Sequence, residues 1–342
     1  MIPTMKGEAV GLFDSFRKDK DEHSKDHGEP AEEIVDKTLE EEEVIEEVFV
    51  DESDEDTAEF EPIEEVIEEP EFKEIKDMSE KKRITHVIGE TKIIAIINQK
   101  GGVGKSTTAV NLSAALGERN KEVLLVDLDP QGNATSGLGV DKSKVKEDIY
   151  EVLLNDVPVE RAIIPDVCEG LDLIPATIDL AGAEVELVNE IARENRLKTA
   201  LGPLRGKYDY IFIDCPPSLG LLTINALVSA DKLLIPIQSE FYALEGVTKL
   251  LDSMKRVKNL LNPSLDIFGV LLTMYDGRTT LSKQVADEVK KYFGKTVFKT
   301  MIPRTVKLSE APSFGQPITE YDPTGKGAQA YINLAKEVIS RG

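Results

Sequence analysis

The chain is poor in cysteine and contains no long apolar run. Its two cysteines, Cys168 and Cys215, lie far apart and in no CxxC or Cys/His spacing. This pattern argues against a disulfide framework or a zinc site and is typical of a protein in a reducing cytosol. No run of about 18 apolar residues is present, and the first residues lack the apolar core and cleavage site of a signal peptide. We therefore expect a cytoplasmic protein without a membrane-spanning segment.

Histidine is also scarce, with none after His86. No Ser-His-Asp or Cys-His arrangement is apparent in the remaining sequence. Any chemistry there must come from positioning and charge, which suffice for phosphoryl transfer.

Acidic residues are abundant, but they are concentrated in the first quarter of the chain. Residues 1–88 have 11 Lys and Arg against 31 Asp and Glu, whereas residues 89–342 have 30 against 33. The acidic clusters repel one another and offer little apolar surface to offset the entropy of ordering. We therefore predict a disordered acidic extension over 1–88 and a folded domain over 89–342. An open alternative is that apolar residues within the extension dock on a partner as short helices.

A short segment near the start has apolar residues on one helical face. Leu12, Phe13 and Phe16 share that face within residues 11–18, and Arg17 and Lys18 follow. The segment resembles the amphipathic starts of some peripheral membrane proteins, which bind lipid weakly by themselves. An unstructured start is the other interpretation.

From about Thr91 onward, short β-branched runs alternate with amphipathic stretches, which predicts a doubly wound α/β domain with a mainly parallel sheet flanked by helices. Buried strands are expected at 92–98, 123–127, 171–175, 208–214, 232–236 and 267–273. Helices are expected at 106–117, 181–204, 219–229, 244–261, 281–293 and 325–340.

The strongest motif is a glycine-rich loop between the first strand and the first helix. Its sequence is Gly101-Gly102-Val103-Gly104-Lys105-Ser106-Thr107. Glycines allow backbone N–H groups to turn toward phosphates, and the helix N-terminus adds its dipole. We expect Lys105 to neutralise phosphate charge, the Ser106 hydroxyl to ligate Mg²⁺ and Thr107 to add a hydrogen bond. The motif predicts ATP and Mg²⁺ as ligands.

Two later strands end in aspartates. Val123–Asp127 is followed by Asp129, and Tyr210–Ile213 runs into Asp214 before Cys215-Pro216-Pro217. We expect Asp127 and Asp129 to point toward the loop above the sheet. Asp214 is expected to hold Mg²⁺ through water, and the prolines to stiffen a loop that senses the γ-phosphate. A strand-end aspartate taken alone is often only a helix cap.

The sequences of these motifs and their order along the chain resemble those of the ParA/MinD superfamily of P-loop NTPases. The resemblance covers residues 91 to about 340 and implies a SIMIBI-type fold. An additional lysine, Lys100, precedes the first glycine and resembles the signature lysine of the deviant Walker A motif. In that family this lysine reaches the ATP of the partner subunit in a sandwich homodimer. The resemblance also implies that Asp129 orients the attacking water and that Asp127 supports the magnesium shell. A solvated surface cation is the other interpretation of Lys100.

Within the superfamily, the segments 129–135, 214–220, 241–246 and 308–313 resemble chromosomal ParA, or Soj-like, proteins. The segment 302–306 resembles the part that lies against adenine, which implies nucleotide contacts from Pro303 and Thr305. The family usually has Asn at the position of Thr305, so this chain departs from the family pattern there. The basic membrane helix that ends MinD-like proteins has no counterpart at residues 339–342.

A basic region provides an independent indication of a nucleic-acid partner. Residues 249–307 contain 12 Lys and Arg and five Asp and Glu. Such a surface would bind phosphates without reading sequence. Arg278 and Lys307 match family positions implicated in non-specific DNA binding, although the second is commonly Arg. A solvated basic face is the alternative.

The combined prediction is a nucleoid-associated ATPase that dimerises on ATP, binds DNA and hydrolyses ATP slowly with a ParB-like partner. The rival prediction is a MinD-like positioning ATPase for a membrane-associated or polar assembly, which does not use DNA.

Overall fold

The computed structural model describes residues 88–240 and 245–341. The predicted acidic extension and its segment 11–18 lie outside these residues, so both remain predictions. None of the described helices has the length and apolar character needed to cross a membrane.

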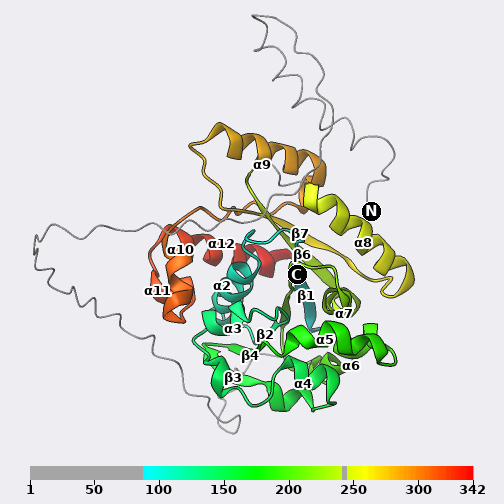
Figure 1. The fold of residues 1–342 in the computed structure, drawn as a ribbon. Helices are drawn as coiled ribbons and strands as arrows, with labels where there is room; N and C mark the ends of the chain where they lie inside the picture. Colours follow the sequence, from blue (N-terminus) through cyan, green and yellow to red (C-terminus); the bar gives the residue numbers. More distant parts are fainter. Residues whose placement is uncertain (1–87, 241–244, 342) are drawn as a thin grey trace, which may run out of the picture. The chain divides into compact units, whose positions relative to one another are not determined.

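A seven-stranded sheet forms the centre of the described part of the chain, with the strand order β3-β4-β2-β5-β1-β6-β7 (Figure 1). Every neighbouring pair is parallel except β3 and β4, which are antiparallel. The predicted mainly parallel, doubly wound sheet is therefore confirmed. The strands are β1 (Lys92–Ile96), β2 (Val123–Asp127), β3 (Ile164–Cys168), β4 (Leu171–Ile174), β5 (Tyr210–Asp214), β6 (Lys232–Gln238) and β7 (Asp266–Thr273).

Helices cover both faces of this sheet, and successive residues of a central strand serve opposite faces. In β2, Val123 and Leu125 belong to one apolar core, and Leu124 and Val126 belong to the other. The first core is closed by α2 (Lys105–Gly117), α3 (Asn133–Gly137), α10 (Lys307–Glu310), α11 (Ile318–Tyr321) and α12 (Lys326–Arg341). The second is closed by α4 (Ile149–Leu154), α5 (Leu180–Glu186), α6 (Arg196–Leu201), α7 (Leu221–Ser229), α8 (Glu245–Leu260) and α9 (Thr280–Phe293).

The helix predicted over 181–204 is wrong as one continuous element. It is divided into α5, α6 and short 3-10 turns, with extended backbone at Glu190 and a positive φ of 54° at Ala192. A tertiary contact holds the break, because the Asn225 amide of α7 donates to the Arg193 carbonyl and its oxygen accepts from the Leu197 N–H. Such a contact is not visible in local periodicity.

The strand β3 was not predicted from the sequence. It contains Pro165 and an exposed Asp166 with a φ of 52°, so it lacks the continuous apolar run of a central strand. Its position at the edge of the sheet tolerates both residues.

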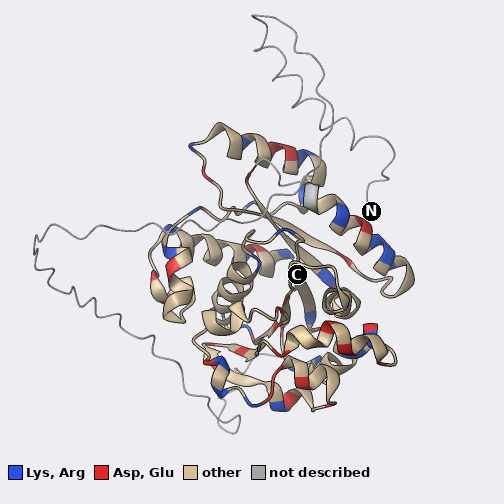
Figure 2. Cartoon of the chain, viewed as in Figure 1, with Lys and Arg blue, Asp and Glu red and all other residues tan. Residues whose placement is uncertain are grey.

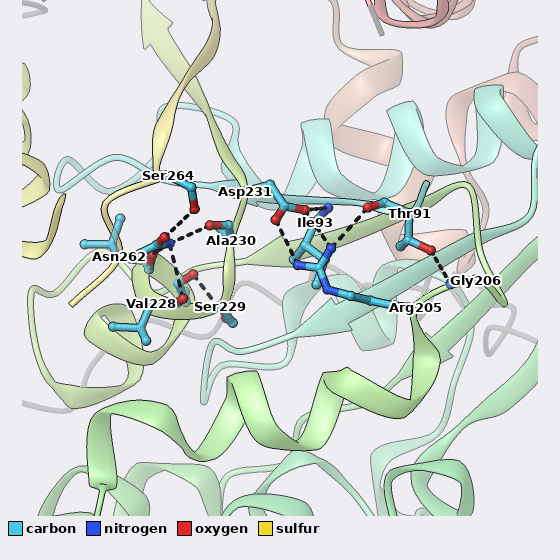
Figure 3. A network of polar contacts seen from close by, with 12 residues as sticks. Thr91, Ile93, Arg205, Gly206, Val228, Ser229, Ala230, Asp231, Asn262 and Ser264 are labelled. Atoms are coloured by element: carbon cyan, nitrogen blue, oxygen red, sulfur yellow. Dashed lines mark hydrogen bonds and ion pairs between the residues drawn. The ribbon is translucent and has the colours of Figure 1, made fainter. Parts of the chain in front are cut away.

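Polar contacts fasten the amino-terminal edge of the sheet (Figure 3). The Arg205 guanidinium forms an ion pair with Asp231 at 2.8 Å, and the Asp231 carboxylate accepts a hydrogen bond from the Ile93 N–H. The Asn262 amide donates to the Val228 and Ala230 carbonyls at the end of α7. These contacts hold β1 and β6 in register. The loops that carry the predicted site leave the opposite, carboxyl-terminal edge.

Candidate functional site

The glycine-rich loop connects the carboxyl end of β1 to the start of α2. Gly102 and Gly104 have φ angles of 71° and 86°, which L side chains rarely adopt. No side chain caps the N-terminus of α2, so its first N–H groups remain available to an anion. The Thr273 hydroxyl of β7 donates to the Val103 carbonyl at 2.8 Å and fixes the loop from the side.

Lys105 is the first residue of α2, and its side chain is buried beside the loop. Its ammonium donates to the Lys100 carbonyl at 3.4 Å. Burial lowers the pKa of Lys105, and the carboxylates of Asp214 and Asp129 oppose that change. The ammonium is therefore held in a poorly hydrated place where negative charge stabilises it.

Asp214 ends β5 beneath the loop and is fully buried, with no hydrogen-bond partner for either carboxylate oxygen. Burial and the nearby Asp127 raise its pKa well above the ordinary value. The Ser106 hydroxyl opposes this rise, although its geometry falls short of a hydrogen bond. A buried carboxylate without donors is an arrangement that a cation stabilises.

Asp127 lies in register with Asp214 on the neighbouring strand, but its oxygens are already occupied. They accept hydrogen bonds from the Thr135 hydroxyl at 2.7 Å, the Thr135 N–H at 2.8 Å and the Asp129 N–H at 3.2 Å. Burial raises the pKa of Asp127 to about 6. The structure thus places Asp127 as a buried support of the turn that carries Asp129.

A cavity of about 500 Å³ lies above these groups, a volume typical of small-molecule sites. It brings together Asp129 and most of the loop. The lining residues that the sequence singled out are Gly101, Gly102, Gly104, Lys105, Ser106, Thr107, Asp129 and Pro217. Lys100, Val103, Asp127 and Asp214 do not line it. Lys100 is half-buried at the start of the loop, and Val103 is buried against the core.

A smaller cavity of about 160 Å³ shares lining residues such as Gly104 and Thr107 with the first. Pro303 and Thr305 both line it, and their predicted contact with nucleotide remains a prediction. The Thr305 hydroxyl accepts a hydrogen bond from the Leu308 N–H at 3.3 Å, so it helps to start α10. This contact gives the threonine a local structural function at the position where the family usually has asparagine.

The predicted basic surface runs along α8 and α9, as the blue segments of Figure 2 show. Its exposed members include Lys249, Arg256, Lys283, Lys290, Lys291, Lys295 and Lys299. Burial, together with the Asp252 carboxylate of α8, raises the pKa of Tyr292 in α9, which indicates that the two helices are neighbours.

Arg278 and Lys307 lie outside both cavities, and each is paired with a nearby carboxylate. Arg278 contacts Asp276 at 2.7 Å, and Lys307 contacts Glu310 at 2.8 Å. Their side chains are 90% and 54% exposed, so both are accessible to a phosphate. Hydrogen bonds between Arg278 and Asp276 lower the pKa of Asp276 to about 2.

Sequence reasoning missed several residues that build the site. Asn98 donates to the Pro236 carbonyl at 2.7 Å and accepts from the Lys100 N–H at 3.0 Å, so it fixes the loop entrance to β6. Thr135 joins Asp127 to the Ala176 N–H. Asn98 lies close to the glycine-rich loop and Thr135 lies within the family-like segment 129–135, but the sequence did not reveal the partner of either side chain.

Comparisons with known proteins agree with this geometry. A family model described as an AAA domain matches residues 91–267. The sporulation initiation inhibitor protein Soj of Bacillus subtilis is 60% identical over 251 residues, 73% of this chain and 99% of that protein. The chromosome partitioning protein ParA of Myxococcus xanthus is 54% identical over 250 residues, 73% of this chain and 88% of that protein.

A solved structure is also similar. It is titled cobyrinic acid a,c-diamide synthase from Mycobacterium smegmatis with bound ADP and magnesium. It is 42% identical with a TM-score of 0.65, and the match covers 73% of this chain and 94% of that chain. With this fold, this phosphate loop and relatives of such identity, the chain belongs to the Soj/ParA family of chromosome-partitioning ATPases.

Proposed function

We propose that the chain is an ATP-dependent dimerisation switch that binds DNA without sequence preference and hydrolyses ATP slowly during chromosome partitioning. The observation that carries the proposal is that the two lysines of the loop occupy different environments. Lys105 is buried in the cavity wall, whereas Lys100 is half-buried and does not line the cavity.

The triphosphate of ATP occupies the large cavity in this proposal. The uncapped N–H groups of α2 and the Lys105 ammonium bind its phosphate oxygens. Thr107 lies where the two cavities meet and adds a hydrogen bond. The adenine extends toward Pro303 and Thr305.

The residues beneath the loop fit Mg²⁺, because the Asp214 oxygens are buried without partners and the Ser106 hydroxyl lies beside them. Among the described residues, no group of three or more His, Cys, Asp or Glu side chains is placed to hold a metal by itself. This agrees with the usual binding of Mg²⁺ through one or two protein ligands, waters and phosphates. Bound there, Mg²⁺ supplies charge neutralisation to the β- and γ-phosphates. Asp127 contributes indirectly to the magnesium site, because it holds the turn that carries Asp129.

Asp129 orients the attacking water in this proposal. It lines the cavity, and its carboxylate is held by a hydrogen bond from the Gln131 N–H at 3.0 Å. Lys100 acts on the nucleotide of a second copy. Hydrolysis is slow because no general base other than a carboxylate faces the cavity among its described lining residues.

DNA binds to the basic surface of α8 and α9 and to Arg278 and Lys307. In a dimer two such surfaces act together, so affinity rises through avidity. The protein is nucleoid-associated in its ATP form, and a ParB-like partner triggers hydrolysis and release.

A gel-shift assay on non-specific DNA, with and without Mg-ATP, tests the proposal. Lys105→Ala is expected to abolish ATP binding. Lys100→Ala is expected to bind ATP without forming a dimer, and Asp129→Ala to remain dimeric on DNA. Normal hydrolysis by Asp129→Ala would refute its assignment.

The DNA surface needs a charge control. Arg278→Glu with Lys307→Glu is expected to weaken binding and to reduce the salt slope by about 2. The matched control is Arg161→Glu with Lys207→Glu, because these exposed cations also pair with carboxylates but lie outside the surface. Equal losses in both double variants would argue against a defined DNA surface. Liposome binding without DNA binding would favour the MinD-like rival.

A further inference from the structure

Helix α5 and the turns next to it present apolar residues on two opposite sides. On the inner side, Leu180 and Ala183 of α5 and Leu187 of the following 3-10 turn are buried in the core. A second stripe is exposed; it consists of Ala181 and Val185 in α5, Ile178 in the turn before the helix and Val188 in the 3-10 turn after it, at spacings of three and four residues. We name these four residues the α5 stripe.

Three members of the α5 stripe are large and strongly exposed. Ile178, Val185 and Val188 are 68%, 73% and 51% exposed, and the nearby Ile191 is 90% exposed. A surface helix normally has one apolar face, and a helix that is apolar on both sides is normally buried. Contiguous exposed apolar residues mark an interaction surface more often than isolated ones do.

The α5 stripe begins at the same edge of the sheet as the nucleotide cavity. It starts just after β4, where the Ala176 N–H donates to the Thr135 hydroxyl at 3.0 Å. Thr135 in turn holds Asp127 below the turn of Asp129, which lines the cavity. The stripe and the cavity therefore lie at the same edge of the sheet.

A second connection links α5 to the loop after β5. The Glu184 carboxylate accepts hydrogen bonds from the Leu221 N–H at 2.8 Å and the Leu222 N–H at 3.4 Å, at the start of α7. A Cβ at Gly220 would collide with this carboxylate, so the close approach requires glycine there. Pro217 of the same loop lines the cavity, and Leu219 is 38% exposed beside it. The position of α5 thus follows the position of that loop.

We propose that the α5 stripe is the apolar part of the contact between two copies of this chain in the ATP state. The inference rests on the proposed dimer. In the proposed dimer Lys100 acts on the nucleotide of the second copy, so the second copy faces the edge of the sheet that carries the cavity. A second copy placed there also covers the stripe at that edge. The stripe supplies the apolar burial that a nucleotide and its charged ligands do not provide.

Sedimentation velocity of the full chain with Mg²⁺ and a non-hydrolysable ATP analogue tests this inference. The variant is Val185→Ser with Val188→Ser, at two positions that are 73% and 51% exposed. In a symmetric dimer each substitution removes its contact twice, so the dimer dissociation constant is expected to rise at least about ten-fold. Binding of a fluorescent ATP analogue to the monomer is expected to stay unchanged.

The matched control is Leu260→Ser in α8, an equally apolar position that is 80% exposed near the opposite edge. It is expected to dimerise like the unmodified chain. If the double serine variant also dimerises normally, the inference is overturned and the stripe binds another partner. If the unmodified chain stays monomeric with saturating analogue, the proposed dimer itself fails.

Discussion

Replacing Asp214 with Asn should stabilise the ligand-free protein while removing its response to Mg-ATP. Both Asp214 oxygens are buried without a partner, and burial together with Asp127 raises the pKa of this carboxyl well above the ordinary value. The ionised group therefore destabilises the fold at neutral pH. Asparagine keeps the shape and removes the charge.

Asparagine leaves a neutral buried amide where the carboxylate was charged, so the expected gain is the difference between the two burial costs, about 1–3 kcal/mol. For a domain of this size it corresponds to a rise in Tm of roughly 2–4 °C per kcal/mol. Because the folded pKa lies above the unfolded one, the destabilisation is present above the folded pKa and disappears as pH falls toward the ordinary value of 3.8. The gain from Asp214→Asn should therefore be largest at neutral pH and shrink on acidification.

Chemical unfolding at several pH values, with and without Mg-ATP, measures both effects. At 100 times its dissociation constant, Mg-ATP should stabilise the unmodified chain by about 2.7 kcal/mol and Asp214→Asn far less. Asp172→Asn is the matched control. The buried Asp172 carboxylate accepts a hydrogen bond from the Tyr208 hydroxyl at 2.7 Å, so the substitution should lower the stability of the protein. Lower stability of ligand-free Asp214→Asn at neutral pH would refute the reasoning.

Two further predictions concern packing and base recognition. Gly117→Ala should lower the free energy of unfolding by about 1–3 kcal/mol, because the added Cβ would collide with the Glu169 carbonyl. Gly101→Ala is the control, because a Cβ there has nothing within 4 Å. Equal unfolding midpoints for the two variants would contradict the predicted clash. Thr305→Asn should strengthen ATP binding about 2- to 10-fold in a fluorescence titration, since an amide adds one hydrogen-bonding group to the smaller cavity. An unchanged dissociation constant would mean that residue 305 does not contact the base.

The sequence predicted the central sheet well because its strands are buried on both faces and carry uninterrupted apolar runs. The bounds of β2 agree with the prediction, and those of β5 differ by two residues at one end. The sequence did not predict the edge strand β3, because it contains Pro165. It also did not predict the break between α5 and α6, because that break depends on Asn225. These features are set by contacts distant in sequence.

The candidate site shows the same limit. The glycine spacing indicated the loop, and the structure places Lys105, Ser106, Thr107 and Asp129 around one cavity. The sequence did not show that Thr135 occupies the oxygens of Asp127 while those of Asp214 stay without partners. Two strand-end aspartates look equivalent in a sequence, and only their surroundings distinguish them. The assigned roles of these residues remain predictions.

The carboxyl end of β7 and the residues directly after it contact three parts of the molecule that are distant from one another in the sequence. Thr273 holds the phosphate loop, Tyr275 exchanges backbone hydrogen bonds with residues 302 and 304, and Asp276 holds Arg278. These anchors fall within four consecutive residues. A shift of this strand end would therefore reach the proposed triphosphate site, the proposed base site and Arg278 at once. If both proposals hold, a defect here should appear in nucleotide and DNA assays together.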